Sequence, residues 1–178
     1  GGNIIKVYAA DGTTLLATTT AAADKSWSIS DSDYVTPITD GQQILKVTAS
    51  DAGGESTAQN FNITVDTVGP RITSSGTAAA IDENSALGTT IYTVAADDVG
   101  GSGVKANSFA LSGPDAGSLT IDSATGAVTI NSSPNFETKS SYSFTVEATD
   151  EANNTTTKDV TLNINNLNEG SSTFEIRG

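Results

Sequence analysis

The 178-residue sequence contains neither cysteine nor histidine. Without cysteine the chain cannot form disulfides, thiolate metal sites or thiol nucleophiles. Without histidine it lacks the commonest general base and the commonest transition-metal ligand. The candidate functional side chains are therefore carboxylates and amides.

Basic residues are scarce too, with 8 lysines and arginines against 21 aspartates and glutamates. The resulting formal charge of −13 repels a phosphate backbone, so we expect no nucleic-acid partner. So acidic a chain is either tuned for solubility or binds hard cations through oxygen ligands. The positions of the carboxylates have to decide between these two interpretations.

Long apolar runs are absent as well. No run approaches the ~18–20 residues of a membrane-spanning helix, so we expect no membrane insertion. The N-terminus shows no signal-peptide pattern, and we interpret the chain as a mature or excised segment. With 36 % hydrophobic and 6 % aromatic residues, its 178 positions suit one large or two small, lightly packed domains.

What the sequence does contain is a regular alternation of apolar and polar residues, clearest within Asn135–Asp150. The residues on one side of this alternation are Tyr142, Phe144, Val146 and Ala148. A period of two predicts a strand with one buried face, which from 142 to 150 runs roughly 25–30 Å. Glu137 and Asp150 therefore lie at opposite ends of a small domain, too far apart for one active site.

Comparable strands separated by turn signals fill both halves of the chain. Turns such as Asp11-Gly12 and Asp40-Gly41 recur every 8–12 residues or so, which is typical of β-sandwiches. In the first half we expect strands at 4–10, 13–20, 27–29, 44–50 and 61–65, with Trp27 in the core. We expect no helix beyond a turn or two near 21–25, 115–117 and 152.

The predicted fold class is all-β, with two tandem β-sandwiches. The first domain covers residues 1–69 and the second covers 70–169. Residues 170–178 are interpreted as a tail or the start of the next module.

Five short motifs characterise the first domain: Val7–Gly12, Ser26–Ser28, Asp40-Gly41, Val47–Gly54 and Val65–Pro70. Together they resemble the bacterial Ig-like repeats of large surface adhesins. That family usually has one or two strands before the segment matching Ile4–Ala10, so the resemblance implies a domain that lacks its first strands. We therefore expect an open sheet edge beside Ile4–Ala10, available to another chain or to the tail Ser172–Arg177.

Six motifs in the second half carry a more specific resemblance. They are Asp82–Asn84, Val94–Asp98, Ile121–Val128, Asn135–Thr138, Val146–Asp150 and Ile164–Glu169. Their order and spacing together resemble a cadherin repeat, over about residues 71–169.

The cadherin resemblance implies Ca²⁺ sites at both ends of the second domain. Calcium takes six to eight oxygen ligands, which such repeats collect from the ends of neighbouring domains and from the segment between them. At the C-terminal end the matching positions are Glu83, Asn135, Glu137, Asn166, Asn168 and Glu169. At the N-terminal end they are Asp97, Asp98 and Asp150. Asn135 and Asn166 stand where the family has acidic residues, and Asp97-Asp98 replaces an Asp-x-Asp pair. We therefore expect weaker or fewer ions at the C-terminal end.

Two carboxylates of the first domain are expected to complete the N-terminal set. Asp40 lies before the strand at 44–50, and Asp66 lies in the segment that leads to Pro70. Five carboxylates in a partly desolvated junction would repel one another by several kcal/mol without a cation. For Asp40 the competing interpretation is that it is a solvated turn residue that binds no ion.

These patterns predict a structural role and no enzymatic activity. Paired carboxylates can hydrolyse glycosides, but two β-sandwiches without an aromatic cleft offer such a reaction little support. We expect a calcium-rigidified extender module of a large secreted, RTX-type bacterial adhesin at the cell surface. Its partners would be neighbouring adhesin domains, with cell-surface or carbohydrate ligands bound by other modules. The alternative is a direct carbohydrate- or protein-binding module, acting through the first domain or the loops near Gly100 and Ser112–Asp115.

Overall fold

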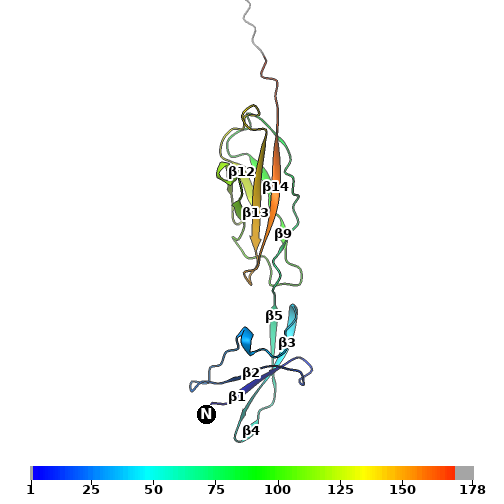
Figure 1. Cartoon of the computed structure of the whole chain (residues 1–178), viewed down its shortest axis with the longest axis vertical. Helices are drawn as coiled ribbons and strands as arrows, with labels where there is room; N and C mark the ends of the chain where they lie inside the picture. The colour runs from blue at the N-terminus through cyan, green and yellow to red at the C-terminus, as the bar shows by residue number, and fades with distance from the viewer. Residues whose placement is uncertain (1, 171–178) are drawn as a thin grey trace, which may run out of the picture. The chain divides into compact units, whose positions relative to one another are not determined.

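The computed structural model describes residues 2–170 (Figure 1). The described chain is all-β, as predicted, apart from two 3-10 turns, η1 (Asp31–Asp33) and η2 (Ala116–Ser118). It divides into two compact units. Unit 1 runs to Val68 and includes Val99–Ser102, whereas unit 2 comprises Gly69–Asp98 and the chain from Gly103 onward. No helix among the described residues has the length and apolar character needed to cross a bilayer.

Unit 1 contains one antiparallel sheet in the order β2-β1-β3, with β4 and β5 both paired to β3. The strands are β1 (Ile4–Tyr8), β2 (Leu15–Thr20), β3 (Gly41–Asp51), β4 (Gly54–Glu55) and β5 (Gln59–Val65). Val7 lies opposite Ala17 of β2 and opposite Val47 of β3. This register places the apolar residues of three strands on one face, where Val7, Leu16, Ala17 and Leu45 form the core.

The layer over this apolar face is the β2–β3 connection, which packs Ile29, Tyr34 and Ile38 against it. The expected strand at 27–29 does not form, and Trp27 is 41 % exposed rather than part of the core. Local hydrogen bonds explain both differences. Asp24 accepts bonds from the backbone N–H and hydroxyl of Ser26, and Asp33 does the same for Ser30. Such side-chain bonds compete with strand pairing.

The predicted open edge beside Ile4–Ala10 is wrong. All five residues of β1 pair with β2 on one side and with β3 on the other, so β1 is an interior strand. Strand order depends on contacts between distant segments, which the motif comparison did not capture. The tail Ser172–Arg177, expected to pair there, lies outside the described residues.

Unit 2 has two main sheets. One has the order β10-β13-β14-β7 and the other β11-β12-β8, and β6 pairs with β9 separately. Figure 1 shows β13 beside β14, and these two strands pair along nine residues of β13. The strands are β6 (Arg71–Ile72), β7 (Ile81–Asp82), β8 (Thr90–Thr93), β9 (Ala96–Asp97), β10 (Ala110–Ser112), β11 (Leu119–Ile121), β12 (Ala127–Ile130), β13 (Ser141–Thr149) and β14 (Thr155–Asn165).

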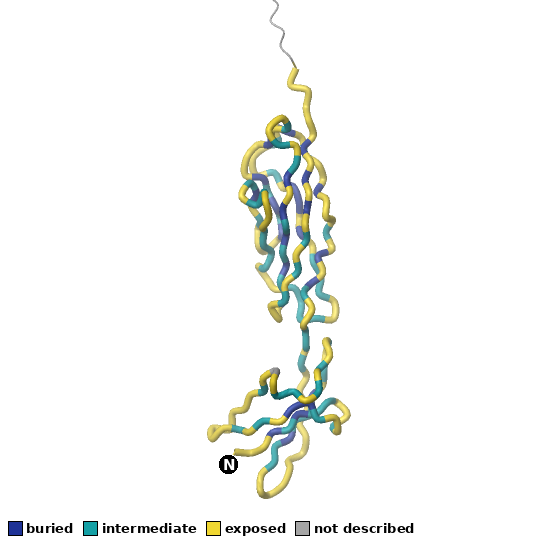
Figure 2. The backbone as a smooth tube through the Cα atoms, viewed as in Figure 1, coloured by how far each residue is buried: buried dark blue, intermediate teal, exposed yellow. Residues whose placement is uncertain are grey.

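The core of unit 2 confirms the alternation predicted for β13. Its inward residues Tyr142, Phe144, Val146 and Ala148 are all buried. They pack with Val160, Leu162 and Ile164 of β14 and with Ile91, Val128 and Ile130 of the other sheet. The Phe144 ring meets Tyr92 edge-on at 5.9 Å between centroids. Figure 2 shows the buried positions alternating with less buried ones along these strands.

Replacing Phe144 with alanine tests this assignment of the core. Deleting a fully buried phenylalanine removes its transfer free energy and leaves a cavity, so unit 2 should lose about 3–5 kcal/mol of unfolding free energy. Phe61→Ala is the matched control, because Phe61 is 48 % exposed on β5. Its cost, measured in the same denaturant titrations by circular dichroism, should be far smaller. Equal costs for the two variants would contradict the packing described.

Candidate metal site

The carboxylate of Asp150 lies at the end of β13 and has no exposed surface. The chain turns back into β14 through residues 150–154, where Asn153 adopts a left-handed φ of 70°. Within this turn Asn154 donates twice, from its backbone N to Oδ1 at 2.8 Å and from Nδ2 to Oδ2 at 2.9 Å. A carboxylate has about four lone-pair sites, so these two bonds leave Asp150 able to accept further ligands.

A second carboxylate, that of Asp98, lies beside Asp150. It follows β9, and its Oδ2 accepts a 2.7 Å bond from the backbone N–H of Gly103. Gly103 in turn accepts a bond from the N–H of Glu151, in the turn that holds Asp150. The left-handed φ of 95° at Gly103 favours glycine, because a side chain would be strained there. One oxygen of Asp98 and one of Asp150 approach within 4.8 Å of each other.

Two carboxylates this close, one of them fully buried, repel each other unless a proton or a cation lies between them. Among the described residues the ion pairs are Lys6–Glu55, Arg71–Asp97 and Lys139–Asp115, so no lysine or arginine pairs with Asp98 or Asp150. Lys105 donates instead to the side-chain amide oxygen of Asn153. The oxygen-only donor set therefore fits a hard divalent cation such as Ca²⁺.

The neighbouring Asp97 has a different role in the structure. Its two oxygens accept bonds from Nε and Nη2 of Arg71, at 3.2 and 2.8 Å. This hydrogen-bonded ion pair lowers the pKa of Asp97 and raises that of Arg71. Both side chains are substantially exposed, so the pair contributes little to stability. Asp97 is the last residue of β9, whereas Asp98 begins the following loop and is bound by Gly103, so the two carboxylates have different partners.

The two predicted aspartates of unit 1 organise the end of that unit. Asp40 accepts bonds from the backbone N–H and hydroxyl of Thr67. Asp66 accepts bonds from the N–H and hydroxyl of Ser102, at 2.8 and 2.6 Å, and from the N–H of Val68. Consecutive residues of one loop, 102 and 103, therefore donate to Asp66 and to Asp98 respectively.

At the C-terminal end of unit 2 the central residue is Glu83, which is only 1 % exposed. Its oxygens accept backbone bonds from Leu167 at 2.6 Å and from Phe136 at 3.0 Å. These two bonds, with a smaller contribution from the Glu137 side chain, lower the pKa of Glu83 below its ordinary value of about 4.5. Burial acts in the opposite direction but is the smaller effect.

Four of the six residues predicted at the C-terminal end line one hollow of about 470 Å³: Glu137, Asn166, Asn168 and Glu169. Amide groups hold its carboxylates, since Asn166 donates to Glu137 and Asn84 donates to Glu169, both at 3.1 Å. Asn135 instead caps its own turn by accepting a bond from the N–H of Thr138.

Sequence reasoning missed three groups that complete these ends, namely Asn84, Gly103 and Asn154. Asn84 ends the motif Asp82–Asn84, and its left-handed φ of 62° is a conformation that asparagine tolerates better than most residues. The Gly-rich run 100–103 was visible too, but nothing in it indicated which carboxylate its amides would bind.

Comparison with known protein families shows which family the second half of the chain matches. A model of the cadherin domain matches residues 77–165. The chain belongs to the cadherin domain family. Cadherin domains are extracellular, non-catalytic repeats that bind Ca²⁺, and the pair Asp98–Asp150 is consistent with that property.

Solved cadherin structures share the fold at low sequence identity. Drosophila N-cadherin EC1-3 aligns with a TM-score of 0.50 at 20 % identity, covering 93 % of this chain and 56 % of that one. The protocadherin gammaB7 EC3-6 cis-dimer structure aligns at 0.51 and 19 %, covering 72 % and 34 %. This chain thus spans between about a third and just over half of these two proteins. No curated protein matches it.

The lowered pKa of Glu83 predicts how unit 2 responds to acid. Because the folded-state pKa lies below the unfolded value, Glu83 stabilises the fold above about pH 4.5 and loses this contribution as the pH falls through the folded value. Glu83→Gln should lower the unfolding free energy at pH 7 and flatten its pH dependence. In glutamine one of the two acceptor oxygens becomes an NH₂ group, which cannot accept a bond from a backbone N–H. Denaturant unfolding between pH 3 and pH 7 measures both effects.

Glu151→Gln is the matched control for that experiment, because Glu151 is an exposed turn residue. It should leave both the stability and its pH dependence close to those of the parent chain. If the unfolding free energy of Glu83→Gln fell between pH 7 and pH 3 as steeply as that of the parent chain, Glu83 would not be the group that stabilises the fold above about pH 4.5.

Proposed function

We propose that this chain is a calcium-stiffened extender module of a large secreted bacterial adhesin of the RTX type. Its partners are neighbouring adhesin domains, and it holds a ligand-binding region away from the bacterial surface. The observation that carries the calcium part is the close pair of Asp98 and Asp150, the latter fully buried. The bacterial assignment draws on the Ig-like motifs of residues 1–69.

In this proposal Asp98 and Asp150 are the principal ligands of the ion, and Asp66 is a further one. Asp66 is included on the sequence motif Val65–Pro70, in which it leads to Pro70. When bound, Ca²⁺ neutralises the carboxylates that otherwise repel one another. If Asp66 also ligates the ion, the segment that leads to Pro70 would be restricted, and this is how the proposal accounts for stiffening.

In this proposal the C-terminal end of unit 2 binds calcium more weakly. Glu137 and Glu169 contribute two carboxylates, and asparagines occupy the other positions around the hollow. Asn166 and Asn84 already donate to those carboxylates, which reduces the repulsion that a cation would relieve. We therefore assign the tighter ion to the Asp98–Asp150 end.

Calcium should raise the stability of the chain through Asp98. A ligand that binds only the folded state stabilises it by RT ln(1 + [L]/Kd), or about 2.7 kcal/mol at a hundredfold excess over Kd. For domains of this size that means several degrees of melting temperature. Calorimetry with calcium and then with chelator should show this shift for the parent chain and its loss in Asp98→Asn.

Asp97→Asn is a closely matched control for Asp98→Asn, since it removes the neighbouring charge but leaves the Asp98–Asp150 pair intact. It should keep most of the calcium-dependent shift. Equal shifts in the parent and Asp98→Asn chains would contradict the proposal, as would a melting temperature that is the same with calcium and with chelator.

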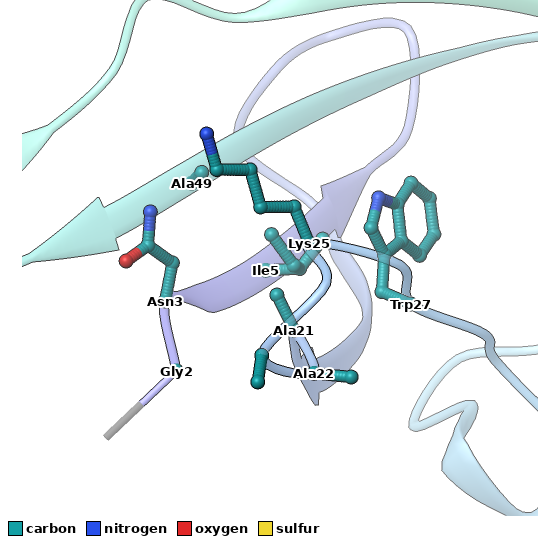
Figure 3. A pocket seen from close by; sticks show the side chains of 9 residues that line it. Gly2, Asn3, Ile5, Ala21, Ala22, Lys25, Trp27 and Ala49 are labelled. Atoms are coloured by element: carbon teal, nitrogen blue, oxygen red, sulfur yellow. The ribbon is translucent and has the colours of Figure 1, made fainter.

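One observation favours the alternative function, direct ligand binding by unit 1. The side chain of Trp27 borders a hollow of about 700 Å³ that is otherwise lined mainly by alanines and Ile5. Figure 3 shows the indole on one side and Asn3 on the other, with Lys25 between them. An exposed aromatic ring with an amide and an ammonium nearby suits a saccharide, because one face of a sugar ring is apolar and its hydroxyls need polar partners.

Trp27 is the only tryptophan in the chain, so its fluorescence reports on this hollow alone. If unit 1 binds sugars here, emission should change saturably with an acidic monosaccharide such as galacturonate, and Lys25→Ala should weaken the response. Lys105→Ala, in unit 2, is the control and should leave it unchanged. Emission that does not respond to any of a panel of neutral and acidic sugars would remove this alternative.

A further inference from the structure

Strand β5 is the last strand of unit 1 and has one unpaired side. It pairs with β3 over seven consecutive residues, from Gly41 opposite Val65 to Val47 opposite Gln59, without a bulge. Within residues 2–170, no other strand pairs with it. Its outer edge therefore presents a regular row of backbone N–H and C=O groups, which is a template for adding a strand.

This edge carries none of the features that usually protect an edge strand. Proteins prevent unwanted pairing with charged residues, proline, bulges or very short edge strands. The sequence of β5 is Gln-Asn-Phe-Asn-Ile-Thr-Val, which has no charge and no proline, in a chain that is otherwise rich in carboxylates. Phe61, at its centre, is 48 % exposed. Such an edge is expected to be covered when the protein functions.

Unit 2 shows what covers the equivalent edge. Its last strand, β14, pairs antiparallel with the long strand β13, just as β5 pairs with β3. The other side of β14 is covered by short parallel pairings, with β7 at Ile81 and Asp82 and with Thr77. In unit 1 the described residues supply no such parallel segment.

We propose that the outer edge of β5 binds an extended segment as an added strand, and that the segment is Ser172–Arg177 of a second copy of this chain. On β5, Phe61, Ile63 and Val65 share the face of the sheet that carries Leu45, because Phe61 lies opposite Leu45 and residues alternate along the strand. A matching strand needs apolar residues at alternate positions on that face.

The tail meets this requirement. Its sequence runs Ser-Thr-Phe-Glu-Ile-Arg, so in an added strand Phe174 and Ile176 would share one face, and Thr173, Glu175 and Arg177 would share the other. Backbone hydrogen bonds would supply affinity and the two apolar side chains would set the register. Because the tail and β5 are different surfaces, each copy donates to the next, and the assembly grows head to tail. The inference does not depend on calcium.

Amide hydrogen exchange and sedimentation of the whole chain test this proposal together. As concentration rises, the parent chain should associate, and exchange of the β5 amides should slow about tenfold or more. The double variant Phe174→Ser/Ile176→Ser should lose both effects. Glu175→Ser, which alters only the other face, should keep them. A synthetic peptide of residues 171–178 added to the double variant should protect the β5 amides again.

Three results would overturn the proposal. One is a peptide that gives no protection to the β5 amides. Another is association that persists unchanged in the double variant, which would mean that the edge pairs with something other than the tail. The third is protection of β5 that is independent of concentration, which would place the donor in the same chain. Each is distinguishable from failure of the calcium proposal, because the experiment is carried out in chelator.

Discussion

A buried negative charge is the constraint on which the N-terminal end of unit 2 depends. Asp150 has no exposed surface, and one carboxylate oxygen of Asp98 lies within 4.8 Å of one of its oxygens. Burying a carboxylate costs several kcal/mol unless its charge is compensated, and a second carboxylate raises that cost. Asn154 supplies a backbone and an amide donor to Asp150, and Gly103 supplies a backbone donor to Asp98. A cation bound here, as proposed, would supply the positive charge that those donors lack.

The opposite end of the same unit meets a similar problem in a different way. Glu83 is almost as buried as Asp150, but two backbone N–H groups bind its oxygens and lower its pKa. Around it, asparagine amides pair with Glu137 and Glu169. Hydrogen bonds thus provide much of the compensation at this end, which is why we propose that the tighter ion binds at the other.

Much of the fold could be predicted because it follows from short-range patterns. The alternation in β13 fixed the buried face around Phe144 and placed Asp150 at the end of the strand. The strand order of unit 1 was harder, since the pairing of β1 on both sides depends on contacts with residues 46–50. Trp27 was misplaced because two aspartates bond locally to serines and keep its segment out of the sheet.

The candidate site was predictable in position but not in detail. Asp97 and Asp98 are adjacent in sequence, and only the structure shows that Arg71, 26 residues away, pairs with the first of them. The second is held by Gly103, which reaches it through a loop whose course the sequence did not specify. The motifs therefore predicted the end of the domain at which these carboxylates lie, whereas the end of β9 and the course of the loop 98–103 determine which carboxylates lie close together.

Crystallography with calcium tests the central claim most directly. Crystals of the full chain grown in Ca²⁺ should contain an ion whose ligands include oxygens of both Asp98 and Asp150, at about 2.3–2.6 Å. Data collected at a wavelength where calcium scatters anomalously would identify the ion. A calcium-soaked structure in which Asp98 and Asp150 ligate no ion, while ions occupy only the hollow between Glu137 and Glu169, would contradict the account.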